Sequence, residues 1–359
     1  MSVVLGVDAG GTSSRAVAVT TAGTVLGRGR AGGGNPVALG AGKAFANLGL
    51  AVRAALAPVD PARVKAVTVG LAGSGMLRDP AVRGALEEAL RGCGLAVAPR
   101  VVGDVVAAFA AGTAARSGTV LISGTGAVAA RIADHEPVAL SDGYGWLLGD
   151  EGSAFWLGRA AARAAVRQAG GEQAGGEQAG GGPAARDAGM LTRLVVRHLL
   201  PAAVKDHEGG EGGEGGEGGE IIVPDGELAD LLAAAAQARH PLALAELAPL
   251  VSRAAAAGDP AAKAIVTGAA ARLARTVSRV HAPGPRTPVV LAGSVLTSEG
   301  PVRGAVQDLL RRRWDGAPVT VAGDGAGAAA WLAAAPFLGP GEAAGLHHRF
   351  TRPLPDPPG

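Results

Sequence analysis

Two glycine-rich turns carry the residues whose types and spacing could do chemistry. The first turn reads Asp8-Ala9-Gly10-Gly11-Thr12, with Arg15 shortly beyond it, and the second reads Gly124-Thr125-Gly126. Each turn lies between two apolar, strand-like runs. Glycines allow consecutive backbone N–H groups to converge, and a threonine hydroxyl adds one more donor. Both turns are therefore expected to bind an anion, although a single turn of this kind can also simply reverse the chain.

The repetition of this hairpin is more specific than either copy alone. The copies lie roughly 115 residues apart, which is about the length of one domain. We infer two similar domains, each pointing a glycine turn into a shared cleft. Asp8, at the end of the strand before the first turn, is expected to hold Mg²⁺ through water, since magnesium keeps much of its hydration shell and prefers carboxylate and phosphate oxygens. The alternative is a turn aspartate that hydrogen-bonds its own backbone.

The elements that must position these turns alternate along the chain. Short β-branched runs at 64–69 and 100–102 are each followed by a helical segment, and Asp79-Pro80 and Asp259-Pro260 both look like the N-cap and first turn of a helix. This alternation predicts a layered α/β fold whose sheets are covered by helices. The segment from about 156 to 281 is mostly Ala- and Leu-rich helix. Strands are expected again at 288–292 and 319–322.

Bulk properties exclude several classes of function. The 359 residues suit two domains, and 33 basic against 31 acidic residues give a formal charge of only +2. That balance argues against a dedicated binder of nucleic acid or of membrane surfaces. Cys93 is the only cysteine, so neither an intramolecular disulfide nor a structural zinc site is expected. The apolar run 3–7 is too short for a signal core or a membrane span, and we expect a cytoplasmic protein.

Two glycine-rich stretches interrupt the pattern. Residues 168–183 contain a tandem Ala-Gly-Gly-Glu-Gln unit, and residues 208–220 repeat Glu-Gly-Gly. Both lack the apolar side chains that would offset the entropy of ordering so much glycine. We expect mobile surface insertions between helices. A regulatory or interaction role stays open, although nothing in the sequence supports it.

The motifs resemble those of a known superfamily. The first turn with Arg15 resembles the first phosphate motif of the actin–hexokinase superfamily, and the second turn resembles its second phosphate motif. The run 291–295 looks like the adenosine motif, and 323–329 looks like the connecting turn and helix. The run 143–153 is similar to the signature of the N-acetylglucosamine kinase branch, which also contains the BadF/BadG-type ATPases. The longer block from Ser141 to Gly158 resembles actinobacterial glucosamine kinases in particular.

This resemblance implies the fold, the domains and the nucleotide site. The implied fold is α/β, with two ribonuclease-H-like domains closing around ATP and a sugar and a C-terminal domain enlarged by helices. Residues 1–114 would form the first domain, completed by a C-terminal helix at about 336–350, and residues 115–335 the second. A homodimer is left open. The residues expected to bind ATP are Gly10, Gly11, Thr12, Arg15, Gly124, Thr125, Gly126, Gly293 and Ser294.

The resemblance also implies which side chains surround the sugar. Asp104 follows the strand-like run 100–102 and matches the carboxylate that faces the sugar hydroxyl in this superfamily. As catalytic base it need only orient the nucleophile and accept its proton late, because phosphoryl transfer passes through a loose transition state. The alternative role of Asp104 is that of a helix N-cap. The other expected sugar contacts are Asn35, Thr125, Asp150, Glu151 and the backbone of Gly143, Tyr144 and Gly145; Glu151 could instead cap the helix near Ser153.

Asp142 supports a separate hypothesis about the choice of substrate. Protonated glucosamine carries an ammonium at carbon 2, whereas N-acetylglucosamine carries a neutral acetamide there. A carboxylate near that carbon would favour the amine, because a desolvated unpaired charge costs free energy. Asp142 lies just before the glycine-tyrosine turn and is placed to do this. The alternative is a solvated loop aspartate.

The preferred hypothesis is therefore phosphorylation of D-glucosamine at the 6-hydroxyl, with ATP and Mg²⁺. An N-acetylglucosamine or broad hexose kinase is the alternative. BadF-type activators hold an iron–sulfur cluster that needs several thiolates, which Cys93 alone cannot supply. Repressor-like sugar kinases carry a Cys-rich zinc motif that is also absent. A non-catalytic, nucleotide-dependent sugar sensor with the same fold remains open.

Overall fold

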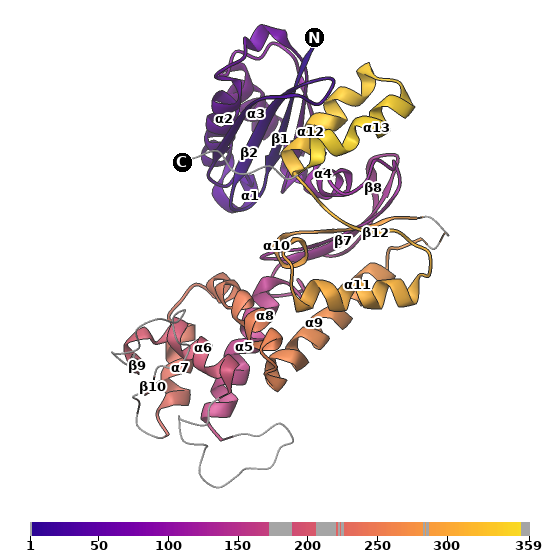
Figure 1. Ribbon diagram of the computed structural model, residues 1–359. Helices are drawn as coiled ribbons and strands as arrows, with labels where there is room; N and C mark the ends of the chain where they lie inside the picture. Colours follow the sequence, from indigo (N-terminus) through magenta and orange to yellow (C-terminus); the bar gives the residue numbers. More distant parts are fainter. Residues whose placement is uncertain are drawn as a thin grey trace, which may run out of the picture.

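The computed structural model consists of two α/β domains stacked one above the other, with a helical extension on the second (Figure 1). The described residues are 2–171, 189–205, 220–221, 223, 226–282, 284 and 287–352. Most of the two glycine-rich stretches expected to be surface insertions, residues 172–183 and 208–219, lies outside the described residues.

The first domain is built on a five-stranded sheet with strand order β3-β2-β1-β4-β5. The β1–β2 and β2–β3 pairs are antiparallel, whereas β4 and β5 are parallel to β1 and to each other. Strand β1 is apolar on both faces because both faces are covered, as is typical of a central strand. The strands are β1 (Val3–Ala9), β2 (Ser14–Thr20), β3 (Val25–Ala31), β4 (Val64–Leu71) and β5 (Pro99–Gly103).

The second domain repeats this topology. Its sheet has the order β8-β7-β6-β11-β12, with two antiparallel pairs followed by two parallel ones. The hairpin β6–β7 therefore corresponds to β1–β2, and the prediction of two similar domains is confirmed. The strands are β6 (Gly118–Ser123), β7 (Ala127–Ala133), β8 (Glu136–Asp142), β11 (Val289–Ala292) and β12 (Val319–Val321).

Helices cover the outer face of the first sheet. Helix α2 packs on β2 and β3, and α3 packs on α2, which encloses a core that includes Leu5, Phe45 and Leu86. The expected N-cap of α3 is confirmed, because the Asp79 carboxylate accepts a hydrogen bond from the Ala81 N–H (2.8 Å). The elements are α1 (Pro36–Leu39), α2 (Ala41–Leu56), η1 (Pro61–Arg63), η2 (Ser74–Arg78) and α3 (Pro80–Arg91).

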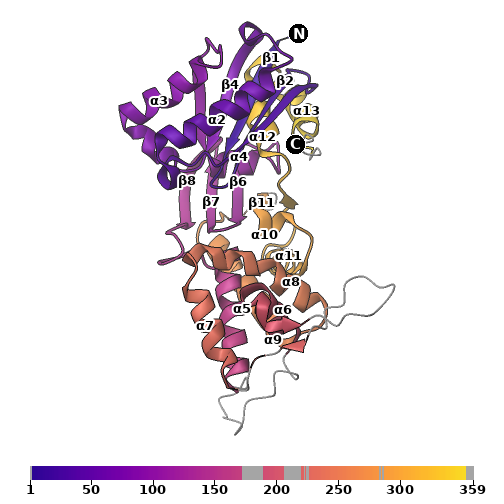
Figure 2. The same ribbon diagram turned by 90° about the vertical axis from the view of Figure 1, so that its left-hand side faces the viewer.

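Helix α4 (Asp104–Ala110) lies where the two domains meet, and α12 (Gly325–Ala334) and α13 (Pro340–Thr351) lie beside the strands of the first domain (Figure 2). Phe109 of α4 and Trp331 of α12 belong to one core with residues of both sheets. Helix α12 packs against β1 and β4 although it lies within the range expected for the second domain. We therefore propose that the chain returns to the first domain before Gly325, and not only at 336.

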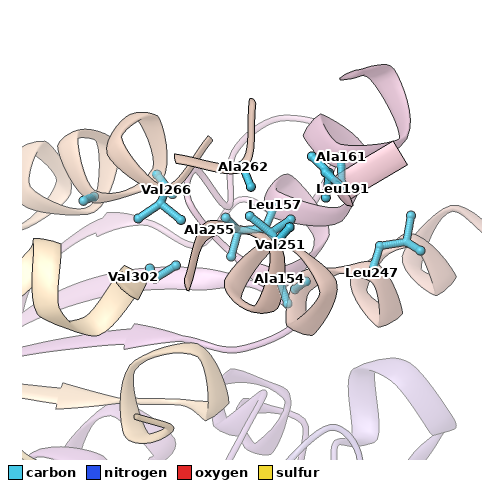
Figure 3. Packing of buried hydrophobic residues seen from close by; sticks show 14 of the residues in the cluster. Ala154, Leu157, Ala161, Leu191, Leu247, Val251, Ala255, Ala262, Val266 and Val302 are labelled. Carbon is cyan, nitrogen blue, oxygen red and sulfur yellow. The ribbon is translucent and has the colours of Figure 1, made fainter. Parts of the chain in front are cut away.

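A helical extension separates β8 from β11. Its core joins α5, α6, α8 and α9, and Figure 3 shows Leu157, Leu191, Val251 and Val266 packed together there. The predicted Asp259 N-cap of α9 is confirmed by a hydrogen bond from the Ala262 N–H (2.9 Å). The helices are α5 (Ala154–Ala169), α6 (Met190–Leu199), α7 (Leu228–Gln237), η5 (Pro241–Leu247), α8 (Ala248–Ala256) and α9 (Pro260–Ser278).

Smaller elements complete the second domain. Helix α11 packs against α9, and the short pair of strands β9 and β10 lies at the far end of the helical extension (Figure 1). Within the described ranges, no helix combines the length and apolar character needed to cross a membrane. These elements are η4 (Pro201–Ala203), β9 (Val204–Lys205), β10 (Glu220–Ile221), α10 (Ser294–Thr297), α11 (Pro301–Arg313) and η6 (Ala335–Phe337).

Candidate active site

A cleft of about 1460 Å³ is lined by residues of both domains. Both glycine turns contribute to its wall, so the expectation that they share one cleft agrees with the structure. Most of the site residues inferred from the sequence lie along this wall. They are Asp8, Gly10, Gly11, Thr12, Arg15, Asn35, Asp104, Gly124, Thr125, Gly126, Gly143, Asp150, Gly293 and Ser294.

The first turn closes the β1–β2 hairpin. The Gly10 N–H donates to the Ser13 carbonyl (3.0 Å), and Asp8 is the direct cross-strand partner of Arg15. Directly opposite residues of a sheet lie on the same face, so the carboxylate and the guanidinium are neighbours on the cleft side. The loop before α1 packs on this turn through a hydrogen bond from the Gly34 N–H to the Gly10 carbonyl (2.8 Å).

That packing places Asn35 in the cleft wall. Asn35 is the N-cap of α1, and its side-chain oxygen accepts a hydrogen bond from the Val37 N–H (2.9 Å). The amide nitrogen is the other polar group of this side chain and is a donor. The side chain thus has a donor to offer to a ligand oxygen while its acceptor is engaged with the backbone.

The second turn closes the β6–β7 hairpin and adjoins the predicted adenosine motif. The Gly124 N–H donates to the Gly126 carbonyl (2.9 Å), and the Gly124 carbonyl accepts from the Ala154 N–H at the start of α5 (2.8 Å). Gly293 lies directly against this turn, because a Cβ built on it would be 2.4 Å from the Ser123 carbonyl oxygen. Its φ of 81° is likewise a conformation that favours glycine.

Asp8 is held in an unfavourable environment for a charge. Burial raises the pKa of its carboxyl to about 6, an effect that nearby Arg15 opposes and that the carboxylates of Asp104 and Asp324 reinforce. A raised pKa means that the ionised form lacks a full complement of stabilising partners. A cation placed among these carboxylates would supply that stabilisation.

The residues present fit a magnesium ion of the kind expected from the sequence. Within the described part of the chain no group of three or more His, Cys, Asp or Glu side chains forms a ready-made metal cage. Mg²⁺ does not require one, because it is commonly bound by one or two carboxylates together with water and substrate phosphates. Asp8, beside a glycine turn suited to phosphate, meets that requirement, and Asp104 and Asp324 are the other carboxylates near it.

Asp104 is the first residue of α4, at the point where β5 ends. Its carboxylate accepts a hydrogen bond from the Val105 N–H (3.0 Å), and Gly103 occupies the N-cap position itself. Burial raises the pKa of the Asp104 carboxyl. Among the described residues Asp104 forms no salt bridge, so its charge is not neutralised by a neighbouring cation. A partly buried carboxylate with a raised pKa is a suitable proton acceptor.

Asp324 was not singled out by sequence reasoning, yet it lines the same cleft. It is the N-cap of α12, where its carboxylate accepts from the Ala326 N–H (3.1 Å), and it forms an ion pair with Arg28 (3.5 Å). Arg28 and Arg30 also line the cleft. Their signal in the sequence is the alternation Gly27-Arg28-Gly29-Arg30, since alternate residues of a strand share one face.

Asp150 reaches the cleft from the loop between β8 and α5. Its carboxylate accepts a hydrogen bond from the Ala127 N–H (3.2 Å), directly beside the second glycine turn. Burial raises the pKa of the Asp150 carboxyl. Asp150 therefore joins the loop that carries it to the turn expected to hold phosphate.

Four of the residues expected to contact the sugar do not line the cleft: Asp142, Tyr144, Gly145 and Glu151. Tyr144 is 71% exposed. Glu151 forms an ion pair with Arg272 of α9 (2.6 Å), and Ser153, not Glu151, is the N-cap of α5. The Asp142 carboxylate is turned toward the backbone of its own loop. Direct contacts of these four residues with a sugar remain predictions.

Solved structures of similar shape include several sugar kinases. A structure from Chromobacterium violaceum described as a candidate N-acetylglucosamine kinase has a TM-score of 0.60 and 24% identity, covering 92% of this chain and 99% of its own. A similarly described structure from Porphyromonas gingivalis has a TM-score of 0.60, 20% identity and coverage of 96% and 98%. A ROK family glucokinase from Streptomyces griseus, with glucose and AMPPNP, has a TM-score of 0.50, 19% identity and coverage of 93% and 98%. These likenesses establish the fold, as expected from the sequence.

Sequence comparison is more specific. An N-acetylmuramic acid/N-acetylglucosamine kinase of Clostridium acetobutylicum is 33% identical over 102 residues, which are 28% of this chain and 32% of that protein. The chain thus matches about a third of the length of this curated relative. The model of the BadF/BadG/BcrA/BcrD ATPase family matches residues 5–331, which is most of the chain. The protein belongs to the BadF/BadG/BcrA/BcrD ATPase family.

Proposed function

We propose that the protein is an ATP-dependent sugar kinase that phosphorylates an amino sugar at its 6-hydroxyl, with D-glucosamine as the preferred substrate. The observation that carries this proposal is the placement of both glycine turns and the partly buried Asp104 carboxylate on one interdomain cleft. The turns offer converging backbone donors for a triphosphate, and Asp104 offers a proton acceptor in the same space. Membership in an ATPase family and the kinase descriptions of several relatives support the choice of ATP as donor.

In the proposed reaction, the sugar O6 forms a bond to the γ-phosphorus and the bond from that phosphorus to the bridging oxygen of ADP breaks. Asp104 takes the proton of the hydroxyl. The turns at 10–12 and 124–126 bind the phosphates, and the turn at Gly293 binds the adenosine part. Asp8 would hold Mg²⁺, which when bound neutralises charge on the phosphate oxygens. Closure of the cleft would exclude water and align donor with acceptor.

Asn35 and Asp150 are the side chains best placed to hold the sugar. Both line the cleft, one from each domain. The Asn35 amide nitrogen would donate to a sugar hydroxyl, and the Asp150 carboxylate would accept from one. The carboxylates of Asp104 and Asp150 both line the cleft, and a substrate with a positive charge next to either of them would be favoured. Glucosamine has that charge at neutral pH.

One observation favours N-acetylglucosamine as the alternative substrate. The carboxylate of Asp142, expected to recognise the ammonium, already accepts three backbone hydrogen bonds and lies outside the cleft wall. It therefore gives no selective advantage to the amine. Several relatives are described as kinases of the acetylated sugar.

The test is a coupled kinase assay with purified protein over glucosamine, N-acetylglucosamine, N-acetylmuramic acid and glucose. The proposal predicts ATP- and Mg²⁺-dependent turnover, with the highest kcat/KM for glucosamine. The highest kcat/KM for N-acetylglucosamine would replace the substrate but keep the reaction. Tight binding of ATP and sugar without any phosphate transfer would favour the sugar sensor instead.

A further inference from the structure

The loop from Asp142 to Gly152 has an unusual backbone. Five of its residues have a φ in the left-handed region: Asp142 (67°), Gly143 (80°), Gly145 (85°), Asp150 (57°) and Gly152 (85°). Glycine adopts this conformation freely, whereas an aspartate does so at a cost in free energy. The free-energy cost of this conformation at the two aspartates must therefore be offset by other interactions. Hydrogen bonds with the surrounding backbone can offset it.

The carboxylate of Asp142 provides these hydrogen bonds. Its Oδ1 accepts from the Gly143 N–H (2.9 Å) and from the Asp150 N–H (2.7 Å), and its Oδ2 accepts from the Glu151 N–H (2.9 Å). A carboxylate that accepts several backbone N–H groups forms stronger bonds than a neutral acceptor would. One side chain thus fastens the start of the loop to its end, across eight residues of chain.

The close fit around this carboxylate depends on Gly149. A Cβ built on Gly149 would be 2.2 Å from the Asp142 Oδ1, so no other residue at 149 leaves room for the hydrogen bond to Asp150. The loop is also fixed to the rest of the domain at its far end, where the Ser123 hydroxyl donates to the Gly152 carbonyl (3.1 Å). The loop is therefore held by the Asp142 carboxylate and, at its far end, by the Ser123 hydroxyl.

The hydrogen bonds to the Asp142 carboxylate determine the position of Asp150. The Asp150 N–H and the next N–H along the chain both donate to Asp142, and this fixes the backbone that bears the Asp150 side chain. From that backbone the Asp150 carboxylate reaches the Ala127 N–H (3.2 Å) beside the second glycine turn. Asp142 itself does not line the cleft, whereas Asp150 does.

We propose that Asp142 is a positioning residue, whose carboxylate holds the loop 143–151 in the one conformation that directs Asp150 into the cleft beside the second glycine turn. This proposal rests on the proposed function for its kinetic consequences and goes beyond it in naming how the sugar ligand is oriented. It also replaces the role expected from the sequence: Asp142 acts through the loop on any sugar that Asp150 binds, and not on the ammonium of one.

The test compares Asp142→Asn with a matched control, Asp134→Asn. Asparagine tolerates a left-handed φ and has nearly the same size, but its NH₂ group cannot accept a hydrogen bond. Asp134 also has a positive φ (54°), lies in the β7–β8 turn, and is 70% exposed beside Arg116. The control thus makes the same chemical change at the same type of backbone conformation, away from the cleft.

Amide hydrogen exchange of the ligand-free protein tests the loop independently of any activity. The single oxygen of asparagine can accept on one side only, so in Asp142→Asn either the Glu151 amide or the amides of Gly143 and Asp150 should exchange at least tenfold faster than in the wild type, with the rest of the second domain unchanged. The control should leave these amides unchanged. Equal exchange of the three amides in wild type and Asp142→Asn would overturn the proposal, whatever the substrate proves to be.

Kinetics test the route through Asp150. Asp142→Asn should raise the KM for the sugar about tenfold or more while changing the KM for ATP less than threefold, because a small displacement of a binding group has a large effect. Glucosamine and N-acetylglucosamine should be affected equally. A loss confined to glucosamine would instead support the ammonium role and refute the positioning role.

A double-mutant cycle separates an indirect effect from an independent one. If Asp142 acts through Asp150, adding Asp142→Asn to Asp150→Asn should raise the sugar KM no further. Fully additive effects would contradict the proposal. Should the wild type phosphorylate no sugar, the proposed function fails, and the exchange experiment still decides whether Asp142 holds the loop.

Discussion

The two domains share one topology but carry different chemistry at corresponding places. In the first hairpin, Asp8 precedes the glycine turn and is paired across the strands with Arg15. In the second hairpin, the position that matches Asp8, the last but one of the strand, is the apolar Ile122, and the last residue of the strand is the neutral, fully buried Ser123. The backbone N–H donors are therefore present in both hairpins, whereas the ionisable side chains that would bind a metal are present only in the first. Under the proposed function, the turn supplies phosphate binding in both copies, and the residues of the strand before it decide what else each copy does.

A second pair of corresponding positions lies where each sheet passes its last parallel strand into a helix. Asp104 follows β5 at the start of α4, and Asp324 follows β12 at the start of α12. Asp324 is paired with Arg28 and caps its helix, whereas Asp104 forms no salt bridge among the described residues and has a raised pKa. Two equivalent carboxylates in one cleft thus differ in their partners. Under the proposed function, the carboxylate without a cationic partner, Asp104, is the proton acceptor.

The largest expected effect tests this difference. Asp104→Asn should lower kcat by about 10²- to 10⁴-fold, the range of general base catalysis, while the sugar still binds. The corresponding change, Asp324→Asn, removes a carboxylate that is already paired, and should lower kcat by less than about tenfold. Steady-state kinetics of both variants, with sugar binding measured by calorimetry, test this difference between Asp104 and Asp324. Near-normal turnover in Asp104→Asn, or an equal loss in both variants, would contradict the assignment.

The next effect concerns the hairpin that carries a charge. Asp8→Asn should lower kcat/KM for MgATP by about 10²-fold, since a carboxylate that holds the metal is replaced by a weaker ligand. Ser123→Ala, at the end of the strand that leads into the neutral hairpin, should change it less than about threefold, because only a hydrogen bond to Gly152 is lost. Kinetics at varied Mg²⁺ concentration measure both. An equal loss in the two variants would mean that the hairpins are not divided in their roles.

The same substitution has a pH-dependent effect on stability. The pKa of Asp8 is raised to about 6, so between its ordinary value of 3.8 and 6 the folded chain binds the proton more tightly than the unfolded chain. The free energy of unfolding therefore falls as the pH rises through this window, by on the order of 2–3 kcal/mol. Asp8→Asn should be more stable than the wild type by this amount at pH 7.5 and equal to it at pH 3.5.

Thermal unfolding of wild type and Asp8→Asn at the two pH values, without nucleotide or Mg²⁺, measures that difference. A stabilisation that is the same at both pH values would show that the ionised carboxylate is not the cause. Addition of Mg²⁺ and an ATP analogue should narrow the difference at pH 7.5, since bound ligands stabilise only the folded protein that can bind them.

The smallest expected effect concerns Glu151, beside Asp150 in the sequence but directed elsewhere. Its carboxylate is half exposed and paired with Arg272, an ion pair of a kind worth about 0–1 kcal/mol. Glu151→Gln should therefore change the sugar KM less than about threefold. Asp150→Asn should raise it at least tenfold, because the Asp150 carboxylate lies in the cleft wall. Steady-state kinetics of the two variants with the same sugar measure this difference in KM. A large effect of Glu151→Gln would restore the direct contact expected from the sequence.

The sequence predicted the local features of this molecule well, because the repeated strand-turn-strand pattern is contained in a few consecutive residues. The packing of α12 against the first sheet was not predicted. Its residues from Ala326 to Ala334 are all buried, so it lacks the apolar stripe that would reveal its partner. The place of Asp324 in the cleft wall was not predicted either. Its equivalence to Asp104 becomes visible only once the strand orders of the two sheets are compared.

Asp142 illustrates a different limit. Its residue type suggested a charge for a substrate, but the direction of the side chain depends on left-handed backbone at 142 and 150 and on room left by Gly149. Such a signal could have been found in the spacing of glycines at 143, 145, 149 and 152, which is typical of a loop that turns repeatedly. Whether a carboxylate in such a loop faces a ligand or the backbone is decided by three-dimensional structure.

The central claim is that both turns hold one triphosphate and that Asp104 faces the acceptor hydroxyl. A crystal structure with Mg²⁺, AMPPNP and glucosamine tests it most directly. The account predicts the β- and γ-phosphates between residues 10–12 and 124–126, with the sugar O6 within hydrogen-bond distance of the Asp104 carboxylate. A nucleotide bound away from either turn, or a sugar whose O6 is remote from Asp104, would contradict it.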